Sequence, residues 1–180
     1  MQELFSVTKI NFLNRALFFL ATFICYLTFM CAWNMVALFF LQKIKIFFPG
    51  ILDSKKSVYK IKKWEQSGKF YSKVLKIKLW KDKLPQYIER EGFSKAHLKS
   101  IRQMTPEYLD EFIRETCLGE LCHIICAIFP FVFVFFYYLY KESIPTEAII
   151  FALGVLIVNF AYIFIQRYNR NRLEKIRRKF

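Results

Sequence analysis

The chain has 180 residues, of which 56% are hydrophobic and 19% aromatic, and its formal net charge is +14. Soluble domains are only about 45 to 50% apolar, so this composition excludes an ordinary soluble domain and predicts an all-α integral membrane protein. A nucleic-acid-binding protein would need a recognisable reading module beside its basic residues. The sequence has none, and we expect no nucleic-acid partner.

The first apolar segment, Ala16 to Leu41, has no charged residue over 26 positions. A helix that crosses the bilayer needs about 20 mostly apolar residues. The alternative is a cleaved signal peptide, whose apolar region is shorter, about 7 to 15 residues, and is followed by a clear cleavage site. We therefore expect residues 1–42 to form a retained transmembrane anchor.

Residues 43–105 form a basic amphipathic region between this anchor and the later apolar segments. Two sets of apolar residues within it recur at helical spacing. They are Val58, Ile61 and Trp64, and then Phe70, Tyr71, Val74 and Leu75. The interleaved lysines and the aromatic residues are typical of helices that lie in the membrane interface. A small soluble cytoplasmic subdomain is the alternative.

A long helix is expected to begin at Pro106, because Thr105 can cap it and proline fits the first helical position. The helical pattern then continues without a break into a second apolar span, Leu121 to Tyr140. Pro130 is expected to kink this span, because proline removes a helical hydrogen bond.

The third apolar span, Ala148 to Ile165, covers 18 residues. Only residues 141–147 connect it to the second span, so the two spans should pack as antiparallel neighbours. Residues 106–180 are therefore expected to form a C-terminal transmembrane hairpin, and the protein should have about three transmembrane helices.

The basic residues are distributed unevenly around these spans. Of the 28 Lys and Arg residues, 18 lie between Lys43 and Arg114, and 7 lie from Arg167 onward. The positive-inside rule places both groups in the cytoplasm. We therefore expect a multi-pass protein of the cell membrane with its N-terminus outside and its C-terminus in the cytoplasm, in contact with anionic lipid.

Glu120 and His123 lie three residues apart at the start of the second span. Residues at this spacing share one face of a helix, so the two side chains are expected to approach each other. A carboxylate fixes the tautomer of a neighbouring imidazole and raises its basicity, which favours His123 as a general base. His123 also lies only about 5 Å past the last charged residue along the helix, near the membrane boundary. The alternative is that His123 only packs at an interface, with Glu120 solvated beside it.

The third span carries a polar stripe that continues toward the cytoplasm. The stripe consists of Asn159, Tyr162, Gln166, Asn169 and Arg170. Because the two spans should be antiparallel neighbours, we expect this stripe to face the glutamate and the histidine. Arg167, Arg170 and Arg172 follow the apolar run directly, and their guanidinium groups are suited to the phosphates of an acyl donor or a phospholipid. An ordinary basic membrane anchor is the alternative.

Other chemistries find less support in the sequence. Cys122, His123 and Cys126 could supply three metal ligands, but neighbouring residues on a helix point about 100° apart, and we expect no metal. Cys117 or Cys122 could act as a nucleophile with His123 as its base. The sequence has no Gly-rich phosphate loop, serine elbow or dinucleotide fingerprint, so we expect no bound cofactor.

Four stretches of the sequence together resemble one family. They are LWKDKLP (79–85), GFSKAHL (92–98), EYLDEFIRETCLGELCH (107–123) and IQRYNRNRL (165–173). Their order and spacing resemble the small bacterial membrane acyltransferases typified by glycosyl-4,4'-diaponeurosporenoate acyltransferase. The E-x-x-H and RYNR blocks are the most specific parts. The chain differs from the family pattern at Leu118, Gly119, Ile124 and Asn171.

This resemblance implies transfer of a fatty acyl chain to a hydroxyl of a glycosylated lipid or carotenoid. His123, held by Glu120, would be the general base, and Asn159, Asn169 or an arginine of the last block would stabilise the oxyanion. The substrate-binding residues would be Trp80, Lys81, Asp82, His97, Gln166, Arg167, Asn169 and Arg170.

The resemblance also implies an acyl donor as co-substrate, which would be acyl-CoA, an acyl carrier protein or a phospholipid. Other membrane biosynthetic enzymes are candidate partners. The alternative function, motivated by the basic residues, is a non-enzymatic membrane protein that binds anionic lipid or scaffolds a partner enzyme.

Overall fold

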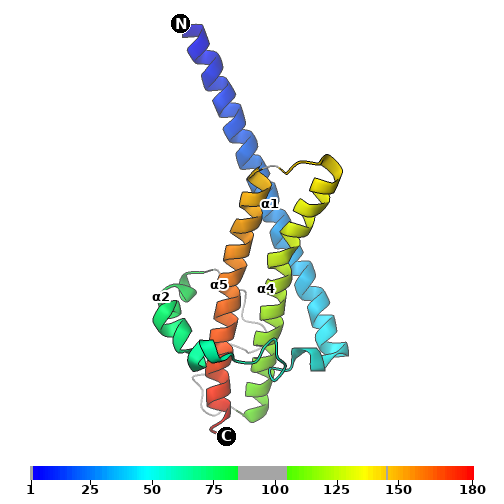
Figure 1. Cartoon of the computed structure of the whole chain (residues 1–180), viewed down its shortest axis with the longest axis vertical. Coiled ribbons are helices and arrows are strands. Elements are labelled where there is room, and N and C mark those ends of the chain that lie inside the picture. The colour runs from blue at the N-terminus through cyan, green and yellow to red at the C-terminus, as the bar shows by residue number, and fades with distance from the viewer. Residues whose placement is uncertain (1, 85–104, 145) are drawn as a thin grey trace.

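The computed structural model describes residues 2–84, 105–144 and 146–180. Three long helices dominate it: α1 (Gln2–Phe47), α4 (Pro106–Lys141) and α5 (Thr146–Arg177), as Figure 1 shows. All regular secondary structure in the described ranges is helical. This confirms the prediction of an all-helical protein.

Helix α4 begins where the sequence predicts it. The Thr105 side chain accepts a hydrogen bond of 3.2 Å from the backbone N–H of Tyr108, and Pro106 occupies the first helical position. Pro130 lies inside the helix, and the part of α4 drawn in yellow leans away from α5 in Figure 1. A proline that removes a helical hydrogen bond and clashes with the preceding turn accounts for such a bend.

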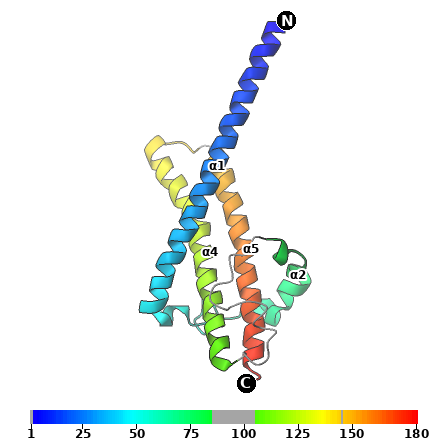
Figure 2. The same cartoon turned by 180° about the vertical axis from the view of Figure 1, so that it is seen from behind.

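Helices α4 and α5 run side by side in opposite directions (Figures 1 and 2). Both are long enough and apolar enough to cross a membrane. Their outer parts are not covered by protein: Phe135, Phe136, Ile150 and Ile157 each remain 57% to 69% exposed. So large an exposed apolar surface indicates contact with lipid, and the hairpin associates with the membrane.

Helix α1 contains the predicted first span and crosses α4. Its N-terminal part extends beyond the other two helices in both views (Figures 1 and 2). The Trp33 ring of α1 stacks on the Phe129 ring of α4, with centroids 3.6 Å apart and an interplanar angle of 6°. Lys45, near the end of α1, forms ion pairs with Glu111 and Glu115 of α4. These contacts fix where α1 meets the hairpin.

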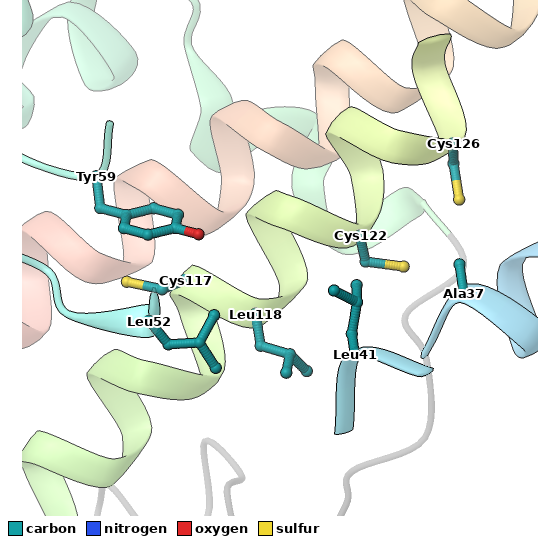
Figure 3. Packing of buried hydrophobic residues seen from close by; sticks show 8 residues of the cluster. All are labelled: Ala37, Leu41, Leu52, Tyr59, Cys117, Leu118, Cys122 and Cys126. Carbon is teal, nitrogen blue, oxygen red and sulfur yellow. The ribbon is translucent and has the colours of Figure 1, made fainter. Parts of the chain in front are cut away.

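A buried apolar cluster joins α1 to the first half of α4 (Figure 3). It contains Ala37, Leu41, Leu52, Tyr59, Cys117, Leu118, Cys122 and Cys126. Leu52 belongs to the short turn η1 (Pro49–Leu52), and Tyr59 follows it in the loop. The small alanine and cysteine side chains allow the helices to approach closely.

The central segment, residues 48–84, does not form the two amphipathic helices that the sequence predicts. It consists of short elements: η1, η2 (Lys63–Gly68), η3 (Phe70–Val74), α2 (Ile77–Trp80) and η4 (Lys81–Lys83). Two residues of this segment have a positive φ, Gly68 at 89° and Lys76 at 46°. Such conformations cannot continue an α-helix.

The predicted apolar face of the first of these helices is also wrong. Val58 and Trp64 are more than half exposed, whereas their neighbours Tyr59 and Glu65 are buried. In the second half of the segment, Tyr71 and Ile77 are fully buried against Tyr168 of α5. Packing against the hairpin, rather than helical periodicity, determines which side chains point inward.

If the central segment is held on α5 by this packing, Ile77→Ala should destabilise it. The isoleucine is fully buried, and such truncations cost about 2 to 5 kcal/mol. The matched control is Leu79→Ala, because Leu79 lies on the same short helix and is 70% exposed. Denaturant unfolding in detergent, followed by tryptophan fluorescence, measures both. Equal losses for the two variants would contradict the packing described here.

Candidate functional site

His123 of α4 contacts two polar residues of the stripe on α5. Its Nδ1 lies 3.0 Å from Oδ1 of Asn159. Its ring also stacks on the ring of Tyr162, with centroids 4.7 Å apart and an interplanar angle of 8°. The predicted stripe therefore does face the histidine, and the imidazole is held on one edge and on one face.

The orientation of the Asn159 amide determines the tautomer of the histidine. Its Nδ2 donates a hydrogen bond of 2.9 Å to the backbone carbonyl of Val155, one turn earlier. The oxygen of the amide must then face His123, so Nδ1 of the neutral ring carries the proton. No described residue forms a hydrogen bond with Nε2, and its lone pair is left to accept a proton.

The sequence predicts that Glu120 pairs with His123, but in the structure the carboxylate has other partners. Its Oε1 accepts a hydrogen bond of 2.7 Å from Nη1 of Arg167, and its Oε2 accepts one from Nη2 of Arg170. Both arginines belong to α5 and are at least nine-tenths buried. Charge-assisted bonds from two guanidinium groups are stronger than a bond from a neutral imidazole, so the carboxylate turns toward α5.

Glu65 of the central segment completes this arrangement, and sequence reasoning missed it. The side chain is fully buried and accepts hydrogen bonds from Nη2 of Arg167 and, at 3.2 Å, from Nδ2 of Asn171. A signal was present: Glu65 and Asp82 are the only acidic residues between Lys55 and Lys83. A lone acid in a lysine-rich stretch is a candidate partner for a buried cation.

Arg167 thus lies between two carboxylates from different parts of the chain. It also donates to the backbone carbonyls of Val58, at 3.1 Å, and Lys60, at 3.2 Å. We call Glu65, Glu120, Arg167 and Arg170 the buried ion quartet. Its two positive and two negative charges balance, which is a condition for burying ionised groups at all.

The pKa of Glu65 reflects these contacts. Burial alone would raise the pKa of this carboxyl group, but the hydrogen bond from Arg167 and the backbone N–H of Lys62 lower it, and the pKa ends below its ordinary value. Glu65 therefore stays ionised at neutral pH, as the quartet requires.

Two further predicted site residues, Gln166 and Asn169, lie on α5. Gln166 packs against Gly119 of α4, where an added Cβ would lie 2.9 Å from Nε2 of the glutamine. Asn169 is half-buried on α5, one turn further along. His97 lies outside the described residues.

Trp80, Lys81 and Asp82 are not brought to the histidine. Trp80 donates from Nε1 to the carbonyl of Leu75, at 2.8 Å. It packs against the buried cluster of Tyr71, Ile77 and Tyr168. Lys81 and Asp82 lie 3.5 Å apart in η4. The described contacts of Glu120 and His123 include none of these three residues.

The cysteines face away from the histidine. Cys122 and Cys126 are buried in the cluster with α1, as Figure 3 shows, whereas His123 faces α5. Sγ of Cys117 lies 3.6 Å from Nη1 of Arg170. Within the described ranges, no group of three His, Cys, Asp or Glu residues could hold a metal ion.

The fold and the site together define a small helical membrane protein with a histidine positioned between two antiparallel helices. Residues 55–179 match the family model for glycosyl-4,4'-diaponeurosporenoate acyltransferase, and the chain belongs to this family. Two relatives of that name come from Staphylococcus aureus strains bovine RF122 / ET3-1 and MRSA252. Each is 28% identical over 126 residues, which cover 69% of this chain and 70% of the relative. No solved structure matches the chain.

These matches confirm the resemblance inferred from the four sequence stretches. Because the relatives are named acyltransferases, the chain is an enzyme that transfers acyl groups. They therefore decide against the alternative of a non-enzymatic lipid-binding or scaffolding protein.

Glu65→Gln should destabilise the protein strongly. The substitution keeps the shape of the side chain but leaves a buried arginine without full compensation, which typically costs about 3 to 5 kcal/mol. Denaturant unfolding of the variant in detergent measures the loss. Glu142→Gln serves as the control, because Glu142 is exposed and surface changes stay within about 0.5 kcal/mol.

The pH dependence of stability, measured for the wild type and for Glu65→Gln, provides a second readout. The folded-state pKa of Glu65 is depressed, so its contribution is fully present above the ordinary carboxyl pKa and is lost as the pH falls through the folded-state pKa. The difference in stability between wild type and Glu65→Gln should therefore narrow in acid. A difference that is small at neutral pH would show that the quartet does not hold the fold together.

Proposed function

We propose that the protein transfers a fatty acyl chain to a hydroxyl on the sugar of a glycosylated carotenoid or a similar lipid acceptor. The names of the two relatives specify a glycosylated diaponeurosporenoate, and this supports an acceptor of that class. The observation that carries the mechanism is the hydrogen bond between Asn159 and His123, since it leaves Nε2 of the histidine free to act.

In this mechanism His123 is the general base. Its Nε2 takes the proton of the acceptor hydroxyl as the oxygen attacks the carbonyl carbon of the acyl donor. The tetrahedral intermediate then collapses, the bond from carbon to the leaving group breaks, and the imidazolium returns the proton to that group. The products are the acylated sugar and the deacylated donor, and the base is regenerated.

The contacts of the polar residues support a division of roles within the site. Asn159 accepts from Nδ1 of His123 through its Oδ1 and donates one N–H to Val155, so we assign it to positioning the histidine. Arg167 and Arg170 are engaged by the quartet and are assigned a structural role. Gln166 and Asn169 are left as the amide donors for the oxyanion.

The proposed topology follows from the distribution of charge. The N-terminus lies outside, α1 contributes a third span, and the central segment lies at the cytoplasmic face with the C-terminus. His123 then lies near the cytoplasmic boundary, where a lipid acceptor can arrive from the bilayer and a donor from the water. The enzyme needs no resident cofactor, and membrane enzymes that make the acceptor are its proposed partners.

His123→Ala should reduce acyl transfer by roughly 10² to 10⁴-fold, the contribution of a general base. The product is measured by mass spectrometry of lipid extracts and, with purified protein, by release of the deacylated donor. Ile128→Ala is the control, because Ile128 lies on the same helix and is 55% exposed. Full activity of the histidine variant, with an unchanged unfolding midpoint, would remove His123 from the mechanism.

Two substitutions at Asn159 separate positioning from oxyanion stabilisation. Asn159→Asp keeps an oxygen that can accept from Nδ1 of His123, whereas Asn159→Leu removes it. Positioning predicts a higher kcat for the aspartate variant than for the leucine variant, with similar KM values. An oxyanion donor predicts the opposite order, because a negative charge beside the oxyanion is worse than no group at all. The ranking of the two kcat values decides between the roles.

A further inference from the structure

A large cavity lies apart from the histidine, at the end of the hairpin where α4 begins and α5 ends. Its volume is about 1000 Å³, and its walls come from the loop after η1, the first turns of α4 and the last turns of α5. Ligand pockets typically measure about 300 to 1,000 Å³, so this space can hold a substantial molecule.

The lining of the cavity combines positive charges with hydrogen-bond acceptors. Five basic residues line it, together with the carboxylates of Asp53, Asp110 and Glu174. Arg177 pairs with Asp110 through hydrogen bonds of 2.8 and 3.1 Å, and Arg114 lies 3.5 Å from Glu111. Lys55, Lys60 and Arg178 form no ion pair with any described residue, and Lys55 and Arg178 act on Asp110 and Glu174 only at longer range. Three uncommitted cations suit phosphate groups, and the carboxylates suit N–H and O–H donors on the same ligand.

The buried ion quartet connects this cavity to the rest of the enzyme. Nη2 of Arg167 donates to the backbone carbonyl of Lys60, at 3.2 Å, and so fixes the stretch of chain from which this lysine lines the cavity. Of the three arginines that the sequence suggested for phosphate binding, Arg167 and Arg170 thus face protein carboxylates. Arg172 is exposed and lies over the ring of Tyr168. The three cations without an ion pair, Lys55, Lys60 and Arg178, line the cavity instead.

The distance from the cavity to the histidine restricts the kind of donor. Ile113 lines the cavity and lies ten residues before His123 on α4, which corresponds to about 15 Å along the helix. In a phospholipid only the glycerol carbons separate the phosphate from the acyl ester. In a phosphopantetheine thioester, the long pantetheine arm with its amide and hydroxyl groups separates them.

We infer that the cavity binds the phosphate-bearing end of a phosphopantetheine thioester, the acyl donor chemistry shared by coenzyme A and acyl carrier proteins. This inference rests on the proposed function, and it names the donor class for the same histidine. The three uncommitted cations bind phosphate, the carboxylates accept from the polar groups of the ligand, and the arm reaches along the hairpin toward His123.

Titration of the full-length protein in detergent with coenzyme A, followed by calorimetry, tests this binding without any turnover. The variant that combines Lys60→Ala with Arg178→Ala should raise the Kd by about tenfold or more, because each removed group makes a charge-assisted contact. Lys73→Ala is the matched control, since Lys73 is exposed in η3 and does not line the cavity. An equal loss for Lys73→Ala would overturn the inference.

A second experiment distinguishes coenzyme A from an acyl carrier protein as the source of the phosphopantetheine group. Binding of an acyl carrier protein in its holo form but not its apo form, weakened by the same double variant, also supports the inference. Absence of binding to both coenzyme A and the holo carrier overturns it. Transfer of a labelled acyl chain from phosphatidylglycerol vesicles, with no thioester present, overturns it as well and leaves the proposed acyl transfer intact.

The same experiments separate failure of the inference from failure of the proposed function. His123→Ala should bind coenzyme A as the wild type does, because the histidine does not line the cavity. With an acyl thioester as donor, the double variant should raise KM for the donor and leave kcat within about twofold, as expected for lost uniform binding. Binding that depends on Lys60 and Arg178, in a protein that acylates no hydroxyl, would support the cavity assignment and refute the proposed function.

Discussion

Arg167 lies between two buried carboxylates, Glu65 from the central segment and Glu120 from α4. An ionised group in such a place is tolerated only when its charge is balanced by well-placed partners, and removing one partner leaves the others uncompensated. The arginine therefore acts as a cross-link between three parts of the chain. It fixes the central segment on the hairpin and fixes how α4 and α5 lie against each other.

The same cross-link determines the geometry around the histidine. His123 follows Glu120 by one helical turn, and Asn159 precedes Arg167 by about two turns on the antiparallel helix. With the carboxylate and the arginine paired, Asn159 and Tyr162 come opposite the imidazole. The charged residues thus serve as a frame that fixes the positions of the polar residues around His123.

Much of the hairpin could be predicted from the sequence, because its signals are local. Thr105 and Pro106 mark the helix start, the length of the apolar runs marks the helices, and the short connection makes them antiparallel. The partner of Glu120 could not be predicted in this way. Spacing along one helix allows a contact with His123, but the choice between the histidine and two arginines depends on how α5 is rotated.

The central segment shows a second limit of sequence patterns. Its apolar residues recur at helical spacing, yet Tyr71 and Ile77 are buried by contacts with Tyr168, nearly a hundred residues away along the chain. Periodicity records which residues could share a face, whereas tertiary packing decides which of them do. The burial of Glu65 has the same origin, since its arginine lies 102 residues further along the chain.

The order of these residues along the chain has a consequence for biosynthesis. A ribosome makes Glu65 first, Glu120 later, and Arg167 and Arg170 last of the four. Until the last helix emerges, both acids lack their counterions and must stay hydrated or protonated. Native docking of the nascent polypeptide is therefore deferred until α5 has been translated, and a product that stops before α5 would expose two unneutralised acids to cellular quality control.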